Sequence, residues 1–235
     1  MENTDKTPPP AASGFSLASF SEDLWLRYAK QIVIAVVVVV VAAAAWFGVR
    51  SLNERRAEAD NKKLGQIYVL LREDNLPAAE QALLVYLAED PSGLARDKAN
   101  LFLGKVYFAQ QRYEDAATAY AKVSGHGKKA TLLHAGALHG LAAARMQLAD
   151  YAAAAKVLEE LIAAYAVRTG DPAENLAGEE VTDLSPNVPN ALWKLALCRR
   201  ELGDAAGARE AAERLVRAHA GTREAADAEK LLTVL

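Results

Sequence analysis

The strongest pattern in the chain is an apolar stretch, Gln31–Val49, that contains no charged residue and is closed by a basic residue at each end. As a helix, this stretch spans ~28 Å at 1.5 Å per residue, close to the ~30 Å hydrocarbon core of a bilayer. Trp25 and Tyr28 precede it and Trp46 lies near its end, as aromatic residues do at membrane interfaces. The pattern predicts a single transmembrane helix.

The residues around this span predict three further segments. Residues 1–21 contain three consecutive prolines and few apolar residues, so we expect a disordered tail. The helix should begin at Glu22, with Ser21 as its N-cap, and the span with its flank should cover residues 22–50. Residues 51–63 are mostly charged or polar and predict a solvated helical stalk, followed by a folded domain over residues 64–235.

The position of the apolar stretch favours a retained anchor over a cleaved signal peptide. The stretch lies behind a polar tail, farther from the N-terminus than a signal peptide normally does. The Ala42–Ala45 run resembles a cleavage site, so cleavage remains the alternative. The only cysteine is Cys198, which leaves no cysteine near the span for a lipoprotein anchor and excludes an internal disulfide.

Beyond residue 64 a pattern of two helices joined by a short polar turn recurs four times. The clearest copy is residues 100–123, NLFLGKVYFAQQRYEDAATAYAKV, which follows L-G-x2-Y-x8-A-x3-[FY] and so resembles the tetratricopeptide repeat. We expect the small Gly104 and Ala116 to let the two helices approach. Tyr107 and Tyr120 should fill the gap between this hairpin and its neighbour.

Weaker copies of the pattern surround this one. The alanines at the matching position are Ala79, Ala116, Ala154 and Ala208, which are 37, 38 and 54 residues apart. Ala154 and Ala208 are therefore further expected packing positions. The long last step contains an acidic, proline-containing insertion, residues 168–189, which predicts either a disordered flap or a partner-binding element.

These observations predict an all-α fold. It consists of one N-terminal transmembrane helix, a tetratricopeptide-like α-solenoid of about four helix pairs, and a C-terminal capping helix over residues 222–234.

The chemistry-bearing residues show no catalytic arrangement. The chain has 27 Lys and Arg against 30 Asp and Glu, so it lacks the basic excess of a nucleic-acid binder. His126, His134, His139 and His219 have no metal-ligand spacing, and there is no phosphate-binding loop or serine–histidine–aspartate order. We expect Cys198 to be a core residue. We predict no enzyme, catalytic residue, metal, cofactor or small-molecule substrate.

The repeat pattern instead predicts a groove for a protein segment. In tetratricopeptide domains the first helix of each pair lines the concave face, and by this resemblance eleven positions face inward. They are Leu64, Tyr68, Leu101, Lys105, Phe108, His139, Ala143, Met146, Trp193, Leu197 and Arg200. Such an apolar strip with a few cations is typical of peptide-binding grooves, although packing between adjacent repeats is the alternative for each residue.

The layout of the whole chain resembles the YfgM-like family, which has a short tail, one span, a charged stalk and degenerate tetratricopeptide repeats. The resemblance implies a single-pass protein of the bacterial inner membrane with periplasmic repeats. It also implies a non-catalytic scaffold whose protein partners are Sec translocon subunits, chaperones or client segments. The charged flanks disagree, because the excess of Lys and Arg after the span predicts cytoplasmic repeats. Alternatives are a scaffold for envelope or outer-membrane assembly and a cytoplasm-facing adaptor of a membrane complex.

Overall fold

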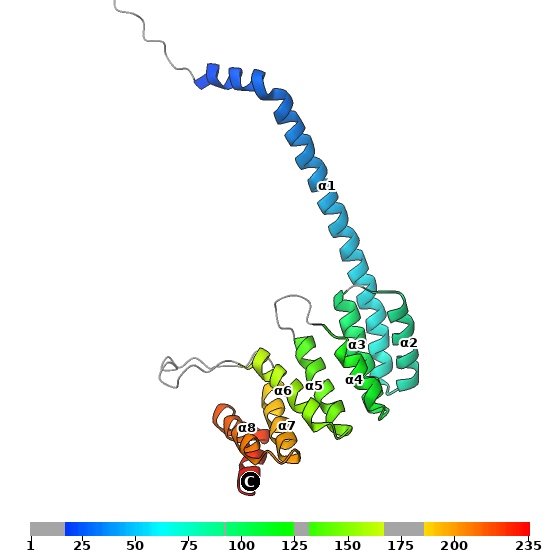
Figure 1. The fold of residues 1–235 in the computed structure, drawn as a ribbon. Coiled ribbons are helices and arrows are strands. Elements are labelled where there is room, and N and C mark those ends of the chain that lie inside the picture. The colour runs from blue at the N-terminus through cyan, green and yellow to red at the C-terminus, as the bar shows by residue number, and fades with distance from the viewer. Residues whose placement is uncertain (1–16, 92, 125–131, 167–185) are drawn as a thin grey trace, which may run out of the picture. The chain divides into compact units, whose positions relative to one another are not determined.

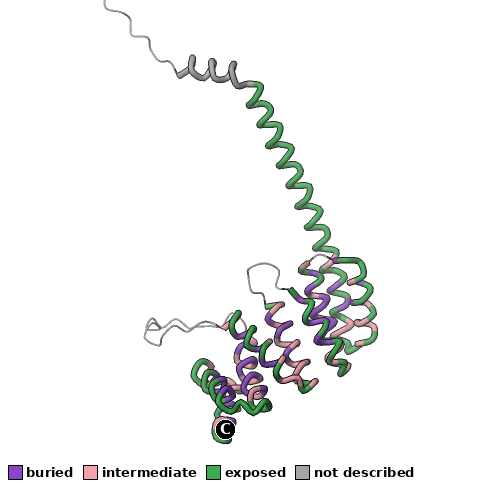
Figure 2. Tube along the Cα trace, viewed as in Figure 1, coloured by how far each residue is buried: buried purple, intermediate pink, exposed green. Residues whose placement is uncertain are grey.

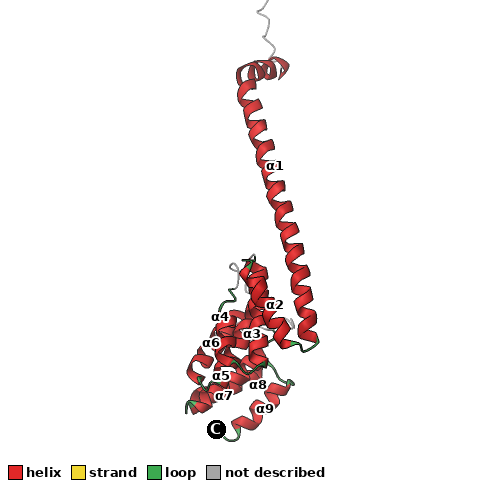
Figure 3. Ribbon diagram, turned by 90° about the vertical axis from the view of Figure 1, so that its right-hand side faces the viewer, coloured by secondary structure: helices red, strands yellow, loops and turns green. Residues whose placement is uncertain are grey.

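A computed structural model describes the backbone of residues 17–91, 93–124, 132–166 and 186–235, with side chains from residue 30 onward except residue 32. All the regular elements of these residues are helices, as Figure 3 shows. The chain separates into two compact units, Met1–Arg56 and Ala57–Leu235. The predicted all-α class is confirmed.

The first unit consists of the N-terminal part of helix α1 (Leu17–Arg72). This helix begins at Leu17, five residues before the predicted start at Glu22, so residues 17–21 are helical rather than part of a tail. Residues 1–16 of the predicted tail lie outside the described residues. The part of α1 that begins at Val33 contains a strongly apolar stretch, with a mean hydropathy of 2.5. None of the residues in this stretch is buried, and Figure 2 shows them as exposed. It is a candidate membrane span by length and composition, a test that a signal sequence also passes.

The second unit is a row of antiparallel helix pairs (Figure 1). The part of α1 from Ala57 pairs with α2 (Leu76–Ala88), and α3 (Gly93–Ala109) pairs with α4 (Tyr113–Ala121). The next pairs are α5 (Leu132–Gln147) with α6 (Tyr151–Tyr165), and α7 (Val188–Glu201) with α8 (Ala205–Ala218). Helix α9 (Arg223–Leu232) packs on α8 and α7. The four predicted pairs and the capping helix are confirmed.

Each second helix packs against the first helix of the following pair, and α3 also packs against α5. The first helices α1 (from Ala57), α3, α5 and α7 therefore share one side of the unit, which we call the first-helix face. Because α7 begins at Val188, the end of the predicted insertion 168–189 is helical. Residues 167–185 of the insertion lie outside the described residues.

The turns inside the pairs repeat one local design. A residue with positive φ stands just before the N-cap of the second helix: Asp74 (57°), Gln111 (63°), Ala149 (57°) and Gly203 (76°). The following N-caps Asn75, Asp150 and Asp204 each accept a hydrogen bond from the backbone N–H three residues on. These caps satisfy amide groups that a helix leaves unpaired at its start, so they fix where each second helix begins.

Alanine-rich packing forms three buried clusters. Figure 2 marks the buried residues along the helices in purple. The first cluster joins α1, α2 and α3 with Ala119 of α4, the second joins α3, α4 and α5, and the third joins α5 through α9. Ala116, Ala154 and Ala208 are completely buried, at the positions that the repeat alignment assigns to packing. Small side chains at these points let neighbouring helices approach closely.

The second cluster is built around the ring of Tyr120 on α4. A Cβ atom added to Gly104 would lie 2.6 Å from Cδ1 of this ring, so only glycine leaves room for it. Tyr107 is half-buried and packs against both the first and the second cluster. The guanidinium of Arg112 lies 4.3 Å from the centre of the Tyr107 ring and also pairs with Glu80 of α2 at 2.8 Å. The two tyrosines thus fill the junctions on either side of the second pair.

Candidate functional site

The first-helix face carries an aromatic and cationic group where α1 meets α3. Tyr68 is 51% exposed, and its ring centroid lies 6.1 Å from that of Phe102. The Lys105 ammonium lies 5.9 Å from the centre of the Phe102 ring, on the next turn of α3. Tyr68 and Lys105 are predicted groove residues, whereas sequence reasoning missed Phe102, which is one position away from the expected Leu101.

The structure corrects the prediction for Leu101. This residue is 8% exposed and belongs to the second cluster, beside Tyr120 and Ala137 of α5. It therefore packs between repeats and is not available to a partner. Leu64 is likewise buried, at 5% exposure. Phe108 is half-buried, and its ring meets that of Tyr113 edge-on with centroids 5.3 Å apart, so this ring contact lies within the second pair.

A polar cluster joins α5, α7 and α9. The Nε2 atom of His139 lies 2.8 Å from Oδ1 of Asn190 and 3.1 Å from Nζ of Lys194. The Nδ2 group of Asn190 donates to Glu224 of α9 at 3.4 Å. Burial lowers the pKa of His139, and the nearby Lys194 charge lowers it further against the Asn190 hydrogen bond. Burial also lowers the pKa of Lys194.

Further residues of the predicted groove lie on the same two helices, α5 and α7. Met146 on α5 and Trp193 and Leu197 on α7 are each half-buried and pack against the third cluster with part of their surface left open. Ala143 is also half-buried. Arg200 is exposed, and its guanidinium pairs with the adjacent Glu201 at 2.7 Å.

Sequence reasoning missed Asn190 and Lys194, although a signal for them exists. Asn190, Trp193, Lys194 and Leu197 have i, i+3, i+4, i+7 spacing, which places them on one side of a helix. The contacts of His139 with Asn190 and Lys194 span 51 and 55 residues and cross the insertion, so no local pattern predicts them.

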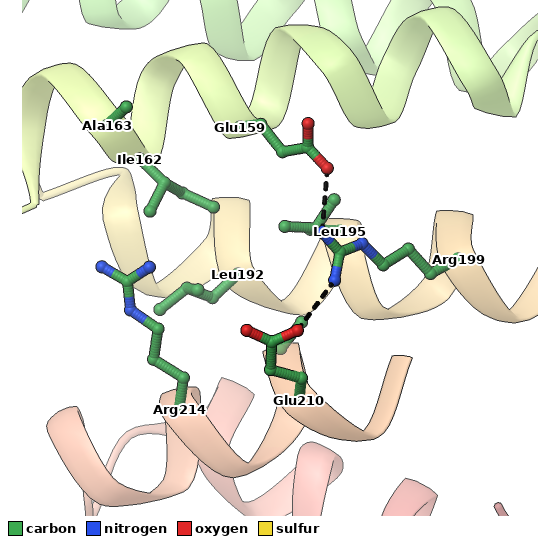
Figure 4. A pocket seen from close by; sticks show the side chains of 9 residues that line it. Glu159, Ile162, Ala163, Leu192, Leu195, Arg199, Glu210 and Arg214 are labelled. Carbon is green, nitrogen blue, oxygen red and sulfur yellow. Dashed lines mark hydrogen bonds and ion pairs between the residues drawn. The ribbon is translucent and has the colours of Figure 1, made fainter. Parts of the chain in front are cut away.

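A hollow lies between α6, α7 and α8 (Figure 4). It has a volume of about 230 Å³ and an apolar floor that includes Ile162 and Leu192. Arg199 bridges its rim by pairing with Glu159 at 2.9 Å and with Glu210 at 3.5 Å, and the hydrogen bond to Glu159 raises the pKa of Arg199. The ion pairs tie three helices together, which makes this hollow a structural junction.

The described residues contain no group of three His, Cys, Asp or Glu side chains that could hold a metal ion. His126 lies outside them. Cys198 is completely buried, and this burial raises the pKa of its thiol to about 11. A thiol in this state is a core residue, as its apolar neighbours in α7 predicted.

Comparison with known families assigns the repeats. A tetratricopeptide repeat-like domain matches residues 22–171, and a tetratricopeptide repeat matches residues 190–222. The chain therefore belongs to the tetratricopeptide repeat-like domain family. No curated protein sequence matches it. Neither match is to a family of enzymes, and tetratricopeptide repeats define a class of protein–protein interaction scaffold.

Solved structures show the same fold at low sequence identity. A tetratricopeptide repeat protein from Parabacteroides merdae is 17% identical, with a TM-score of 0.56 over 74% of this chain and 59% of the other. MamA is 18% identical, with a TM-score of 0.53 over 76% of this chain and 85% of its own. PilF from Pseudomonas aeruginosa is 18% identical, with a TM-score of 0.52 over 76% and 71%. The chain spans less than two thirds of the first of these structures.

Proposed function

We propose that this protein is a membrane-anchored, non-catalytic scaffold that binds a segment of a partner protein on its first-helix face. The observation that carries the proposal is the row of partly open apolar side chains on that face, from Tyr68 of α1 to Trp193 and Leu197 of α7. Aligned apolar surface of this kind marks interaction sites in soluble domains. Tyr and Trp are the residues that most often dominate binding energy, so Trp193 and Tyr68 should contribute most.

We further propose that Gln31–Val49 is retained as a single span of the bacterial inner membrane and that the repeats lie in the periplasm. The exposed apolar length of α1 supports an anchor, and the resemblance to the YfgM-like layout supports the orientation. On this proposal the partners are translocon subunits, chaperones or client segments. A scaffold of envelope assembly and a cytoplasm-facing adaptor are the alternatives, and the second is favoured by the positive residues that follow the span.

Crosslinking in native membranes tests the binding face. Trp193→Ala and Tyr68→Ala should each lose the partners that the wild type captures, because each removes an aromatic contact from the first-helix face. Leu84→Ala is the matched control, since Leu84 is 46% exposed but lies on the second helix α2. Phe108→Ala should have a smaller effect, because its ring is already packed against Tyr113.

A deletion of residues 173–184 tests whether the partner binds the insertion or the first-helix face. If the deletion loses every partner while the aromatic variants keep them, the insertion is the binding site and the proposed face is wrong. Thermal unfolding of each variant shows whether a loss of partners comes from unfolding.

Protease added to spheroplasts tests the orientation. The repeat domain should be digested without membrane rupture if it is periplasmic. Protection of the domain would favour the cytoplasm-facing adaptor.

A further inference from the structure

The two ends of the row of helix pairs differ. At the C-terminal end, α9 packs on α7 and α8 and covers the last pair. The row begins with the first pair, which consists of α1 from Ala57 and α2 (Figure 1). A hollow of about 300 Å³ opens between these two helices, and all the residues that line it belong to α1 or follow it in and directly after α2. We call this hollow the outer groove; Gln66 and Leu70 line it from α1, and Ala82 and Val85 line it from α2.

The outer groove corresponds to a surface that the second pair uses for helix packing. With the step of 37 residues between these pairs, Val69 and Ala82 match Val106 of α3 and Ala119 of α4. Val106 and Ala119 are buried in the first cluster, where the second pair meets the first. Val69 is instead 50% exposed, Val85 is 58% exposed and Ala82 is only half-buried. The surface that is covered on the second pair is therefore open on the first.

The outer groove combines an ordered apolar floor with polar walls. The ring of Tyr86 is buried in it, and the Tyr86 hydroxyl donates to a carboxylate oxygen of Asp60 at 2.7 Å, which fixes the floor. At the position of the buried Leu103 of the second pair, the first pair has the exposed Gln66. An apolar centre surrounded by polar residues is typical of an interface between separately folded subunits.

The charges at the edge of the outer groove suit a second copy of the same chain. Lys63 of α1 and Glu89, directly after α2, both line the groove and form an ion pair with each other. Both side chains are about half exposed, so each can meet a further group of opposite charge. In a two-fold contact, residue i of one copy meets residue j of the other, and j meets i. Lys63 of each copy would thus meet Glu89 of the partner subunit, and the four charges would alternate in sign.

We propose that two copies of this chain form a two-fold dimer through their outer grooves. The contact buries the exposed Val85 of both copies and joins Lys63 and Glu89 of both copies in one network of alternating charges. Two chains anchored in one membrane keep this symmetry when the two-fold axis is perpendicular to the membrane. The inference does not rest on the proposed binding face, because Tyr68 of that face contacts Phe102 of α3 and does not line the groove.

Photocrosslinking in native membranes tests the contact. Full-length chains with two different affinity tags are expressed together, each with the photoreactive p-benzoylphenylalanine in place of Val85. Ultraviolet light should produce a species that carries both tags and has the mass of a dimer. The same photoreactive residue in place of Arg209, which is exposed on α8, is the matched control and should give no such species.

Charge reversal then distinguishes the contact between chains from the ion pair within one chain. Lys63→Glu and Glu89→Lys should each lower the yield of crosslinked dimer about tenfold, because each places like charges at both contacts of the two-fold interface. Expression of the two variants together should restore a mixed dimer, because both contacts between the chains then join opposite charges. The pair within each chain stays like-charged, so it cannot explain the recovery. Lys156→Glu and Glu160→Lys, on exposed positions of α6, are the matched controls and should leave the yield unchanged.

Three results would overturn the dimer. The first is the absence of a two-tag species from the chain with the photoreactive residue at position 85, or its replacement by a crosslink to a different protein. The second is a yield that both charge reversals leave unchanged, since the copies would then meet through another surface. The third is failure of the mixed expression to restore the dimer when both variants are folded by circular dichroism. Where a variant does not fold, the crosslink from position 85 with the native charges decides.

Discussion

The ring of Tyr120 lies directly against Gly140, where the second helix pair meets the first helix of the third. A Cβ atom added to Gly140 would lie 2.6 Å from Cζ of the ring, and one added to Gly104 would lie 2.6 Å from Cδ1 of the same ring. Two glycines from α3 and α5 thus hold one tyrosine between them, and this contact fixes how closely the second and third pairs approach.

Gly140→Ala should therefore destabilise the repeat unit by about 1–3 kcal/mol, the usual cost of overpacking a buried site. The matched control is Gly136→Ala on the same helix, where the added Cβ would meet only Cδ1 of Leu101, at 4.0 Å. That change should be neutral or stabilising by up to about 1 kcal/mol, because alanine favours helix more than glycine does. Urea unfolding followed by circular dichroism measures both. Equal effects of the two substitutions would contradict the proposed contact.

The repeated turns predict that two substitutions change the stability of the repeat unit in opposite directions. Ala149 holds a φ of 57° that costs an L-residue roughly 1 kcal/mol, so Ala149→Gly should stabilise the unit by up to about that amount. Gly203 has a φ of 76° at the equivalent turn, and Gly203→Ala should destabilise the unit by a similar amount. The shift of the unfolding midpoint has opposite sign in the two variants. A shift of the same sign would mean that the turns are not equivalent.

The polar cluster predicts a dependence of stability on pH. The pKa of His139 is lowered in the folded chain, so near its ordinary value of about 6.5 the unfolded chain binds more protons. The contribution of His139 to stability is present above that value and is lost as pH falls toward the folded pKa. His139→Gln should flatten the fall in the free energy of unfolding between about pH 7 and pH 5. Parallel pH profiles of wild type and variant would contradict this role of His139.

The reactivity of Cys198 should report on opening of the third cluster. Because the thiol is completely buried and its pKa is raised to about 11, iodoacetamide should modify it only when the third cluster opens. Labelling followed by mass spectrometry should be slow in buffer and fast in urea. Rapid labelling of the folded protein would show that the cluster around α7 is open to solvent.

The sequence predicts the helix pairs well because the residues that pack the two helices together lie close to one another in the sequence. Gly104, Ala116 and Tyr120 lie within one hairpin, so a pattern of 17 residues from Gly104 to Tyr120 contains the whole contact. The α7 and α8 pair and the α9 cap follow from the same periodicity. The predicted helix start at Glu22 is five residues too late, because Ser21 fits an N-cap by composition although the helix begins at Leu17 and passes through Ser21.

The proposed binding face is less predictable, because a shift of one residue along a helix turns a side chain by about 100° around the helix axis. Leu101 and Phe102 are neighbours in the chain, yet the first is buried against Tyr120 and the second stands beside Tyr68. The family pattern identifies the small residues at the close contacts between helices. It does not say which way the side chains between those positions point. The contact of His139 with Lys194 depends on how the chain returns after the insertion, which no spacing within a repeat encodes.

The unequal sizes of the three clusters have a mechanical consequence. The third cluster joins five helices, whereas the middle one, around Tyr120, is the smallest and alone includes buried residues of both α4 and α5. Tension applied between an anchored N-terminus and a cargo held near α7 would be carried through that middle junction. Rupture of that junction would release α5 through α9 as a block that keeps its own, larger core.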